Sequence, residues 1–68
     1  MRVILISNVE RITRSGEKVI RGIVHDDARF PEGARIISSP VLGVEERDGL
    51  VYYTTRNTRY MAVSHIRH

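Results

Sequence analysis

Residues 44–62 read VEERDGLVYYTTRNTRYMA and decide the fold of this chain. Asp48-Gly49 separates residues 44–47 from the apolar run at 50–53, which is the pattern of a two-residue hairpin turn. A second turn is expected at Arg56-Asn57. The first turn pairs Arg47 with Leu50, Glu45 with Tyr52, Val44 with Tyr53 and Leu42 with Thr55. The second turn pairs Thr55 with Thr58, Tyr53 with Tyr60, Tyr52 with Met61 and Val51 with Ala62.

This register divides the side chains of the two hairpins between two faces, because successive strand residues point to opposite sides. One face is apolar and is expected to be core; it carries Leu42, Val44, Val51, Tyr53, Tyr60 and Ala62. The other face carries Leu50, Tyr52, Met61 and Val63 beside Glu45, Arg47, Thr54 and Arg59. We predict that this second face closes a barrel or contacts a second subunit, because it is too apolar to remain in water.

Upstream of the hairpins, valine and isoleucine dominate the apolar positions and predict further strands. Strands are expected over residues 2–13 and 18–25, with a bulge at Ser7-Asn8 and a turn at 14–17. A third strand is expected over 34–45, interrupted at Pro40, because proline cannot donate a ladder hydrogen bond. The sequence therefore predicts an all-β fold, a five-stranded meander that closes into a small SH3-like barrel. Helix is limited to one short turn, at 26–33 or 64–68.

Length and composition indicate one globular domain over residues 1–68. The chain is 41% hydrophobic and 28% charged, carries a net charge of +3 and has no cysteine, which excludes disulfides and thiol nucleophiles. A domain of this size buries only about 60% of the surface that its unfolded chain exposes. We therefore expect a homo-oligomer or a bound ligand to add stability. No apolar stretch is long enough to cross a membrane and no signal peptide is visible, so we expect no membrane association.

Residue types that serve catalysis or metal binding are present without a supporting motif. His25, Asp26, Ser38 and Ser39 include the types of a hydrolytic triad, but no nucleophile-elbow pattern surrounds them. His65 and His68 are three residues apart and have no carboxylate partner. Phosphate-binding glycine motifs are absent. We predict a protein that is not an enzyme, with no metal and no cofactor.

Two segments, 28–35 and 54–60, together with Ser38-Ser39, supply guanidinium groups, hydroxyls and aromatic rings. These groups suit a ligand that carries a phosphate and a base. The ligand-binding residues predicted on this basis are Arg29, Phe30, Ser38, Ser39, Thr55, Arg56, Asn57, Arg59 and Tyr60. A purely structural interpretation is also open, because threonine and tyrosine are common in strands and asparagine is common in turns.

The same segments resemble small phage and prophage proteins. Arg29-Phe30-Pro31-Glu32-Gly33, then Ile36-Ile37-Ser38-Ser39, then residues 55–60 are similar to a pattern in which an RF-x-[DE]-G loop precedes an I-x-[ST]-S strand and a T-x-N-[ST]-x-Y hairpin. The similarity covers roughly residues 22–63, and Ser38 stands where threonine is more usual. Such proteins are mostly uncharacterised, and several small phage β-proteins inhibit host defence or transcription. The resemblance implies a phage-type protein in the cytoplasm of a bacterial host.

Three hypotheses of function follow. In the first, an oligomeric barrel sequesters a phosphate-bearing nucleotide or cyclic nucleotide signal, with Arg29, Arg56 and Arg59 holding phosphate. In the second, the chain inhibits a host enzyme such as RNA polymerase or a defence nuclease, docking through a sheet edge or the face of Leu50, Tyr52, Met61 and Val63. In the third, the chain binds nucleic acid, although the acidic stretch 25–50 breaks a continuous basic track.

Overall fold

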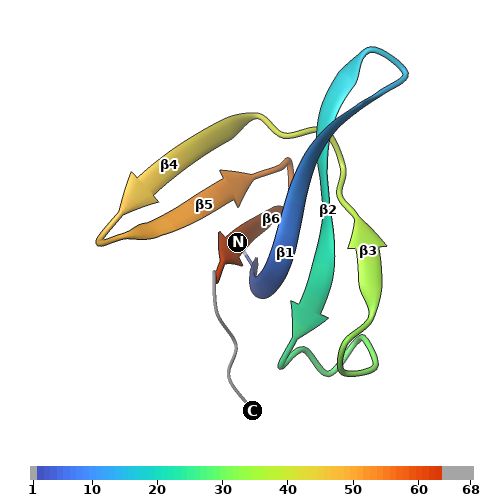
Figure 1. Cartoon of the computed structure of the whole chain (residues 1–68), viewed down its shortest axis with the longest axis vertical. Helices are drawn as coiled ribbons and strands as arrows, with labels where there is room; N and C mark the ends of the chain where they lie inside the picture. Colours follow the sequence, from blue (N-terminus) through green and yellow to red (C-terminus); the bar gives the residue numbers. More distant parts are fainter. Residues whose placement is uncertain (1, 64–68) are drawn as a thin grey trace.

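The computed structural model describes residues 2–63 and contains only strands and turns in that range. The six strands are β1 (Arg2–Arg14), β2 (Glu17–His25), β3 (Arg35–Ile37), β4 (Gly43–Arg47), β5 (Leu50–Thr54) and β6 (Thr58–Ala62). They form one mixed sheet in the order β3-β2-β1-β6-β5-β4 (Figure 1). The all-β prediction is therefore confirmed. Residues 26–33 form turns rather than helix, and the alternative helical position, 64–68, lies outside the described residues.

The register of both C-terminal hairpins is the one predicted from residues 44–62. Across the first hairpin the ladder pairs Val44 with Tyr53, Glu45 with Tyr52 and Arg47 with Leu50. Across the second it pairs Val51 with Ala62, Tyr52 with Met61 and Tyr53 with Tyr60. Asp48 and Gly49 have φ values of 52° and 78°, as a type I′ turn requires. The predicted pair of Leu42 with Thr55 lies just beyond the ladder, whose last pair is Gly43 with Thr54.

Strand β1 lies at the centre of the sheet and changes direction at a bulge. Its residues 2–6 pair in parallel with β6, from Arg2 opposite Thr58 to Ile6 opposite Ala62. Its residues 5–14 pair in antiparallel fashion with β2, with a register shift between Ser7 and Glu10. Asn8 within the shift has a φ of 52°, so the predicted bulge is confirmed. The parallel pairing with β6 makes the fold something other than a simple meander.

The predicted closed five-stranded barrel is wrong. The strand expected over 34–45 is divided into β3 and β4, which lie at opposite edges of an open sheet. Segment 38–42 joins the two edges through single hydrogen bonds instead of a ladder. The Ser38 and Val41 amides each donate to β2, at 2.8 Å, and the Leu42 amide donates to the Thr54 carbonyl at 2.7 Å. Pro40 within this segment has no amide hydrogen, which prevents a continuous ladder.

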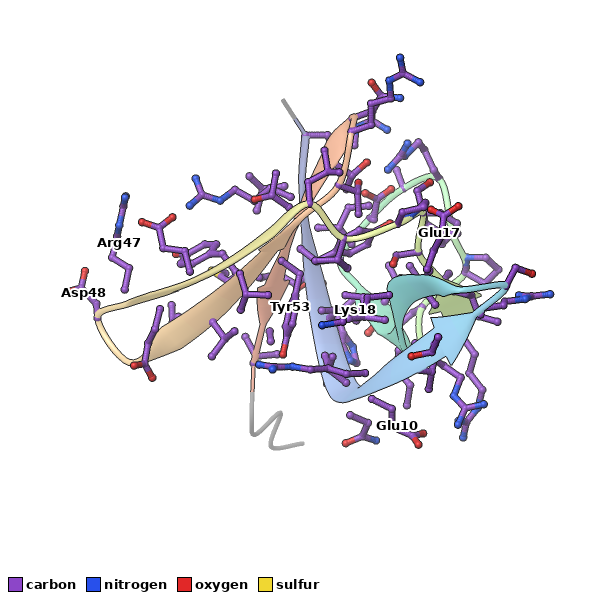
Figure 2. All side chains as sticks on the ribbon, turned by 90° about the horizontal axis from the view of Figure 1, so that it is seen from above. Glu10, Glu17, Lys18, Arg47, Asp48 and Tyr53 are labelled. Carbon is purple, nitrogen blue, oxygen red and sulfur yellow. The ribbon has the colours of Figure 1, made fainter. Side chains whose placement is uncertain are left out.

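The core lies where β1, β2, β5 and β6 meet. Its buried cluster consists of Ile4, Ile6, Ile20, Val24, Tyr53 and Tyr60. The prediction of Tyr53 and Tyr60 as core is confirmed, and Val51 and Ala62 pack against the cluster while partly buried. The same prediction is wrong for Leu42 and Val44, which are 72% and 52% exposed. Figure 2 shows the hairpin with Arg47 and Asp48 extending away from the rest of the sheet, so the side of β4 that was expected to be core is left exposed.

Candidate functional site

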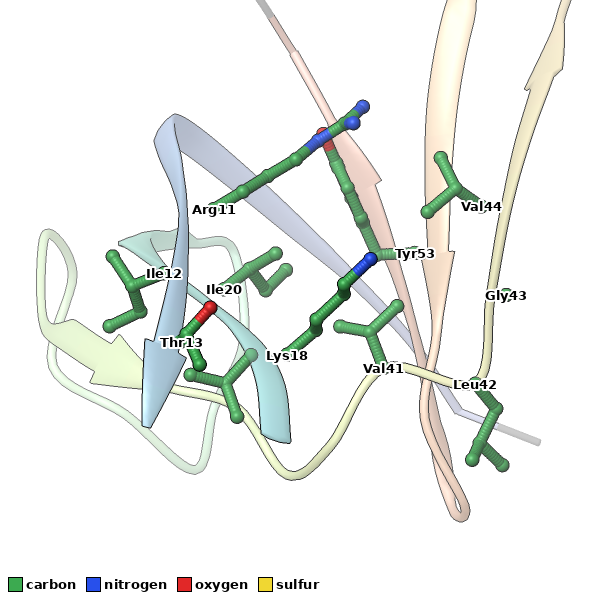
Figure 3. A pocket seen from close by; sticks show the side chains of 11 residues that line it. Arg11, Ile12, Thr13, Lys18, Ile20, Val41, Leu42, Gly43, Val44 and Tyr53 are labelled. Atoms are coloured by element: carbon green, nitrogen blue, oxygen red, sulfur yellow. The ribbon is translucent and has the colours of Figure 1, made fainter. Parts of the chain in front are cut away.

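A groove of about 430 Å³ lies between the β1–β2 hairpin and the β4–β5 hairpin (Figure 3). It is lined by residues 11–13 of β1, 18–20 of β2, the stretch 41–44 and Tyr53 of β5. We call this feature the hairpin groove. It exists because β1 turns away from β6 at its bulge, while β5 continues alongside β6 into the second hairpin.

The walls of the hairpin groove are largely apolar. Val19 and Ile20, on the β2 side, are buried at 6% and 1% exposure. Leu42 and Val44, on the opposite side, remain exposed. Apolar side chains that face open space across a groove are typical of binding surfaces, because burying them beneath a partner or ligand removes them from water.

Two cations project into this apolar groove, Arg11 and Lys18. The Arg11 Nε–H donates to the Tyr53 hydroxyl at 3.2 Å, and the guanidinium lies 5.3 Å from the centroid of the Tyr53 ring. Figure 3 shows the Arg11 and Lys18 side chains both reaching across toward Tyr53. Lys18 makes no side-chain hydrogen bond or ion pair within residues 2–63, and no acidic side chain is among the described residues of the lining. The groove is therefore electropositive.

Cross-strand geometry explains why these cations share one face. Arg11 pairs with Ile20 and Thr13 pairs with Lys18, so Arg11, Thr13 and Lys18 are near neighbours on the same side of the β1–β2 ladder. Sequence reasoning missed this site. The Ser15-Gly16 turn fixes that register locally, so the sequence could have predicted that Arg11 and Lys18 share one face. The opposite wall of the groove could not be predicted, because it depends on long-range topology.

Several polar groups of the predicted ligand site are bonded within the chain. The Ser38 hydroxyl accepts from the Ile20 amide at 3.0 Å and donates to the Ser39 carbonyl at 2.7 Å. The Thr55 hydroxyl donates to the Thr58 carbonyl at 3.0 Å, within the second hairpin turn. Both hydroxyls therefore have structural roles, and their role in binding a ligand stays a prediction.

The two aromatic residues of the predicted ligand site lie near Arg29. Its guanidinium lies 5.4 Å from the Phe30 ring centroid and is ion-paired with Asp27. Hydrogen bonds from Arg29 hold the pKa of the Asp27 carboxyl below its ordinary value. Phe30 packs against the cluster that contains Tyr60. Burial raises the pKa of the Tyr60 phenol, and the charge of Arg29 opposes that rise.

The remaining predicted residues are spread over the second hairpin and segment 38–42. Arg59 is ion-paired with Glu45 and lies 4.6 Å from the Tyr52 ring centroid, while its Nε atom is buried without a hydrogen-bond partner in the described part of the chain. Arg56, Asn57 and Ser39 are exposed. Ser38 and Ser39 lie beside the middle of β2, whereas Arg29 lies beyond its C-terminal end. The structure thus brings Arg29, Phe30 and Tyr60 together and leaves the serines apart from them.

The side chains predicted to form an interface are all half-buried in the single chain; they are Leu50, Tyr52, Met61 and Val63. Tyr52 and Met61 are cross-strand partners, and Arg59 covers one side of the Tyr52 ring. Their role in contacts with another subunit stays a prediction. His65 and His68 lie outside the described residues.

Comparisons with known protein families, with curated proteins and with solved structures find no match to this chain. The resemblance to small phage proteins therefore stays a prediction. Within residues 2–63, no helix is long or apolar enough to cross a membrane.

Proposed function

We propose that this protein is a binding module that holds a phosphate-bearing ligand of nucleotide size in the hairpin groove. The observation that carries the proposal is the pairing of two cations with an apolar lining that, among residues 2–63, contains no acidic side chain. A volume of about 430 Å³ lies within the range of small-molecule sites, roughly 300–1,000 Å³. Guanidinium and ammonium groups bind phosphate oxygens through charge-assisted hydrogen bonds, and the apolar walls accept a base or another flat group.

Arg11 is the central residue of the proposed site. Its Nε–H is bonded to the Tyr53 hydroxyl, which orients the guanidinium and leaves its two terminal nitrogens without a partner among residues 2–63. Lys18 supplies a second donor on the same face, and the Thr13 hydroxyl adds a neutral one. The three groups stand close enough along the β1–β2 ladder to contact one phosphate group.

Sequestration of a host nucleotide signal is the biological role we assign to this binding. The proposal moves the main phosphate contacts from Arg29, Arg56 and Arg59 to Arg11 and Lys18. This move is supported by the ion pairs that already occupy Arg29 and Arg59. Assembly of several subunits stays part of the proposal, because a second copy over the groove would enclose the ligand more fully.

The first experiment maps binding residue by residue. ¹⁵N-labelled protein is titrated with ADP and with a cyclic dinucleotide, and amide shifts are followed by NMR. We expect saturable shifts at Thr13, Lys18 and Tyr53. Saturable shifts confined to Asn57 and Arg29 would instead support the site predicted from sequence and overturn the groove assignment. Native mass spectrometry of gently purified protein then identifies any ligand carried from the cell, together with the number of subunits.

Matched variants test the two cations. Arg11→Ala and Lys18→Ala each remove one charge-assisted contact, which is worth about 1.5–3 kcal/mol, so each dissociation constant is expected to rise about tenfold to a hundredfold. Arg14→Ala is the control, because Arg14 is exposed on the same strand and does not line the groove. An equal loss of affinity in all three variants would show general charge attraction rather than a site.

A second candidate function is docking on a protein partner through β4. All five residues of β4 are exposed and the strand lies at the sheet edge, so an extended segment of a partner can add to it. Leu42→Ser removes an exposed apolar side chain beside this edge. It is expected to weaken capture of a protein partner by at least about tenfold, whereas Arg11→Ala, which removes a proposed phosphate contact on β1, should leave that capture within about threefold.

A further inference from the structure

A chain of hydrogen bonds links Ser7, His25 and Glu32 outside the hairpin groove. The Ser7 hydroxyl lies 2.7 Å from His25 Nε2, and Glu32 Oε2 lies 2.8 Å from His25 Nδ1. The three residues come from β1, the last position of β2 and the loop that follows β2. The triad residue types noted around His25 are thus completed by Ser7 and Glu32, while Ser38 is bonded elsewhere.

The order of the atoms in this chain is the order that activates a serine. A carboxylate on Nδ1 fixes the imidazole so that Nε2 is the nitrogen that accepts a proton from the hydroxyl. The Glu32 carboxylate is itself oriented, because its Oε1 accepts from the Asp26 amide at 3.0 Å. The Gly33 amide donates to the Val24 carbonyl at 3.1 Å and the Val24 amide donates to the Ala34 carbonyl at 2.8 Å, which fixes the loop against β2.

The backbone directly after Ser7 leaves the regular strand pairing, which bears on whether an amide there can donate to a substrate. Asn8 has a φ of 52°, and neither the β1–β2 register nor the β1–β6 register pairs Asn8 or Val9. In α/β-hydrolases the amide of the residue after the nucleophile donates to the developing oxyanion. Asn8 occupies that position here, at the bulge rather than inside a ladder.

We propose that Ser7, His25 and Glu32 form a nucleophilic site that accepts an acyl group from a small ester. Ser7 Oγ bonds to the carbonyl carbon while its proton passes to His25 Nε2, and the imidazolium then gives that proton to the leaving alcohol. Water attacks the acyl-serine with His25 as base and releases the acid. Glu32 is a positioning residue, which holds the imidazole through Nδ1. Ser7 is 8% exposed, so the site admits only small electrophiles.

The test uses methanesulfonyl fluoride, an electrophile small enough for a buried serine, as the probe on the full chain. Ser7 Oγ bonds to the sulfur, fluoride leaves and the serine proton passes to His25. Intact mass and peptide mapping are expected to show one sulfonyl group on Ser7. Ser39→Ala, which removes an exposed serine, is expected to label at the wild-type rate. A folded wild-type protein that takes no label on Ser7 would overturn the proposal and leave a structural hydrogen-bond network.

Variants of His25 and Glu32 test whether these residues activate Ser7 or whether Ser7 reacts without them. His25→Gln is expected to lower the rate of Ser7 labelling about a hundredfold, and Glu32→Gln at least about tenfold. Circular dichroism checks that each variant is folded; Glu32→Gln is the safer one, because the Glu32 side chain is 63% exposed. Equal labelling rates in wild type and both folded variants would overturn the relay.

Discussion

The β1–β2 hairpin and the β4–β5 hairpin have the same turn chemistry but contribute differently to the molecule. Both turns place two residues at positive φ, Ser15 and Gly16 in one and Asp48 and Gly49 in the other. Yet β1 and β2 supply most of the buried side chains, whereas every residue of β4 is exposed and β5 buries only Tyr53. Position in the sheet order decides this difference, because β1 has a strand on each side and β4 has one neighbour.

This comparison indicates that the buried core belongs mainly to the first hairpin, while the proposed binding groove draws on both hairpins. A strand with two neighbours gains side-chain contacts on both sides, while an edge strand keeps free backbone groups and exposed side chains. The hairpin groove lies between the two regions and uses one wall of each. Changes at the buried side chains of the first hairpin should therefore act on folding, whereas changes at the exposed side chains of β4 should affect folding little.

The largest expected effect comes from shortening the most buried side chain. Ile6 in β1 has no exposed surface, so Ile6→Ala is expected to lower the free energy of unfolding by about 2–5 kcal/mol. The matched change in the second hairpin is Val44→Ala, at a side chain that is 52% exposed, and it should stay within about 0.5 kcal/mol. Urea denaturation followed by circular dichroism measures both. A similar loss of unfolding free energy in the two variants would contradict the difference in packing between the two hairpins.

A smaller effect is expected from adding one methyl group to a glycine in each hairpin. A Cβ at Gly22 of β2 would lie 2.6 Å from Ile6 Cγ1 and 2.8 Å from the Ser7 carbonyl oxygen. Gly22→Ala should therefore destabilise the fold by about 1–3 kcal/mol, because the core must shift to admit the methyl group. A Cβ at Gly43 of β4 would meet nothing within 4 Å, so Gly43→Ala is the control. If Gly43→Ala proves the more destabilising by thermal denaturation, the second hairpin is more tightly packed than the structure indicates.

The parts of the fold that sequence predicts well are the local ones. The Asp48-Gly49 turn determines which residues face one another, and so the pairs from Val44–Tyr53 to Arg47–Leu50 were predictable one by one. The parallel pairing of β1 with β6 was not predictable, because it joins segments more than fifty residues apart through no turn. Barrel closure was mispredicted for the same reason, since it depends on how β3 and β4 separate around Pro40.

The candidate site divides along the same line. Residue types in 28–35 and 54–60 predicted binding groups, and the structure brings Arg29, Phe30 and Tyr60 near one another. The hairpin groove escaped prediction because its two walls, Lys18 and Val44 among them, meet only after the whole sheet is assembled. The exposure of Leu42 and Val44 could not be predicted either. Alternation along a strand shows which side of the sheet a residue faces but not whether other side chains cover that side.

The smallest effect extends the comparison to pH, through the tyrosines of the two regions. Tyr60 of β6 belongs to the core beside β1, and burial raises the pKa of its phenol above the ordinary value of 10.0. We expect wild-type protein to lose stability in alkali more steeply than Tyr60→Phe, by up to about 1.4 kcal/mol per pH unit. For each protein, urea denaturation gives the free energy of unfolding at about pH 7 and at about pH 11. The two proteins are compared by how much this free energy falls between the two pH values. Val51→Ala, which shortens a side chain packed against the same cluster and leaves Tyr60 in place, is the control and should keep the wild-type steepness.

The direction of this effect follows from the order in which the two states lose the proton. As pH rises above 10, the phenol ionises first in the unfolded chain, where it is in water, while the buried Tyr60 still holds its proton. The unfolded state then binds fewer protons than the folded state, so the contribution that is complete below about pH 10 is lost as pH rises through the folded pKa. Tyr60→Phe has no phenol to ionise, so it should lack this pH-dependent loss of stability. Any change that the substitution causes in stability at neutral pH does not matter, because each variant is compared with itself at two pH values. A Tyr60→Phe protein that falls as steeply as wild type would mean that the phenol is hydrated in the folded state, and the packing of β6 against β1 would then be looser than that of the β1–β2 hairpin.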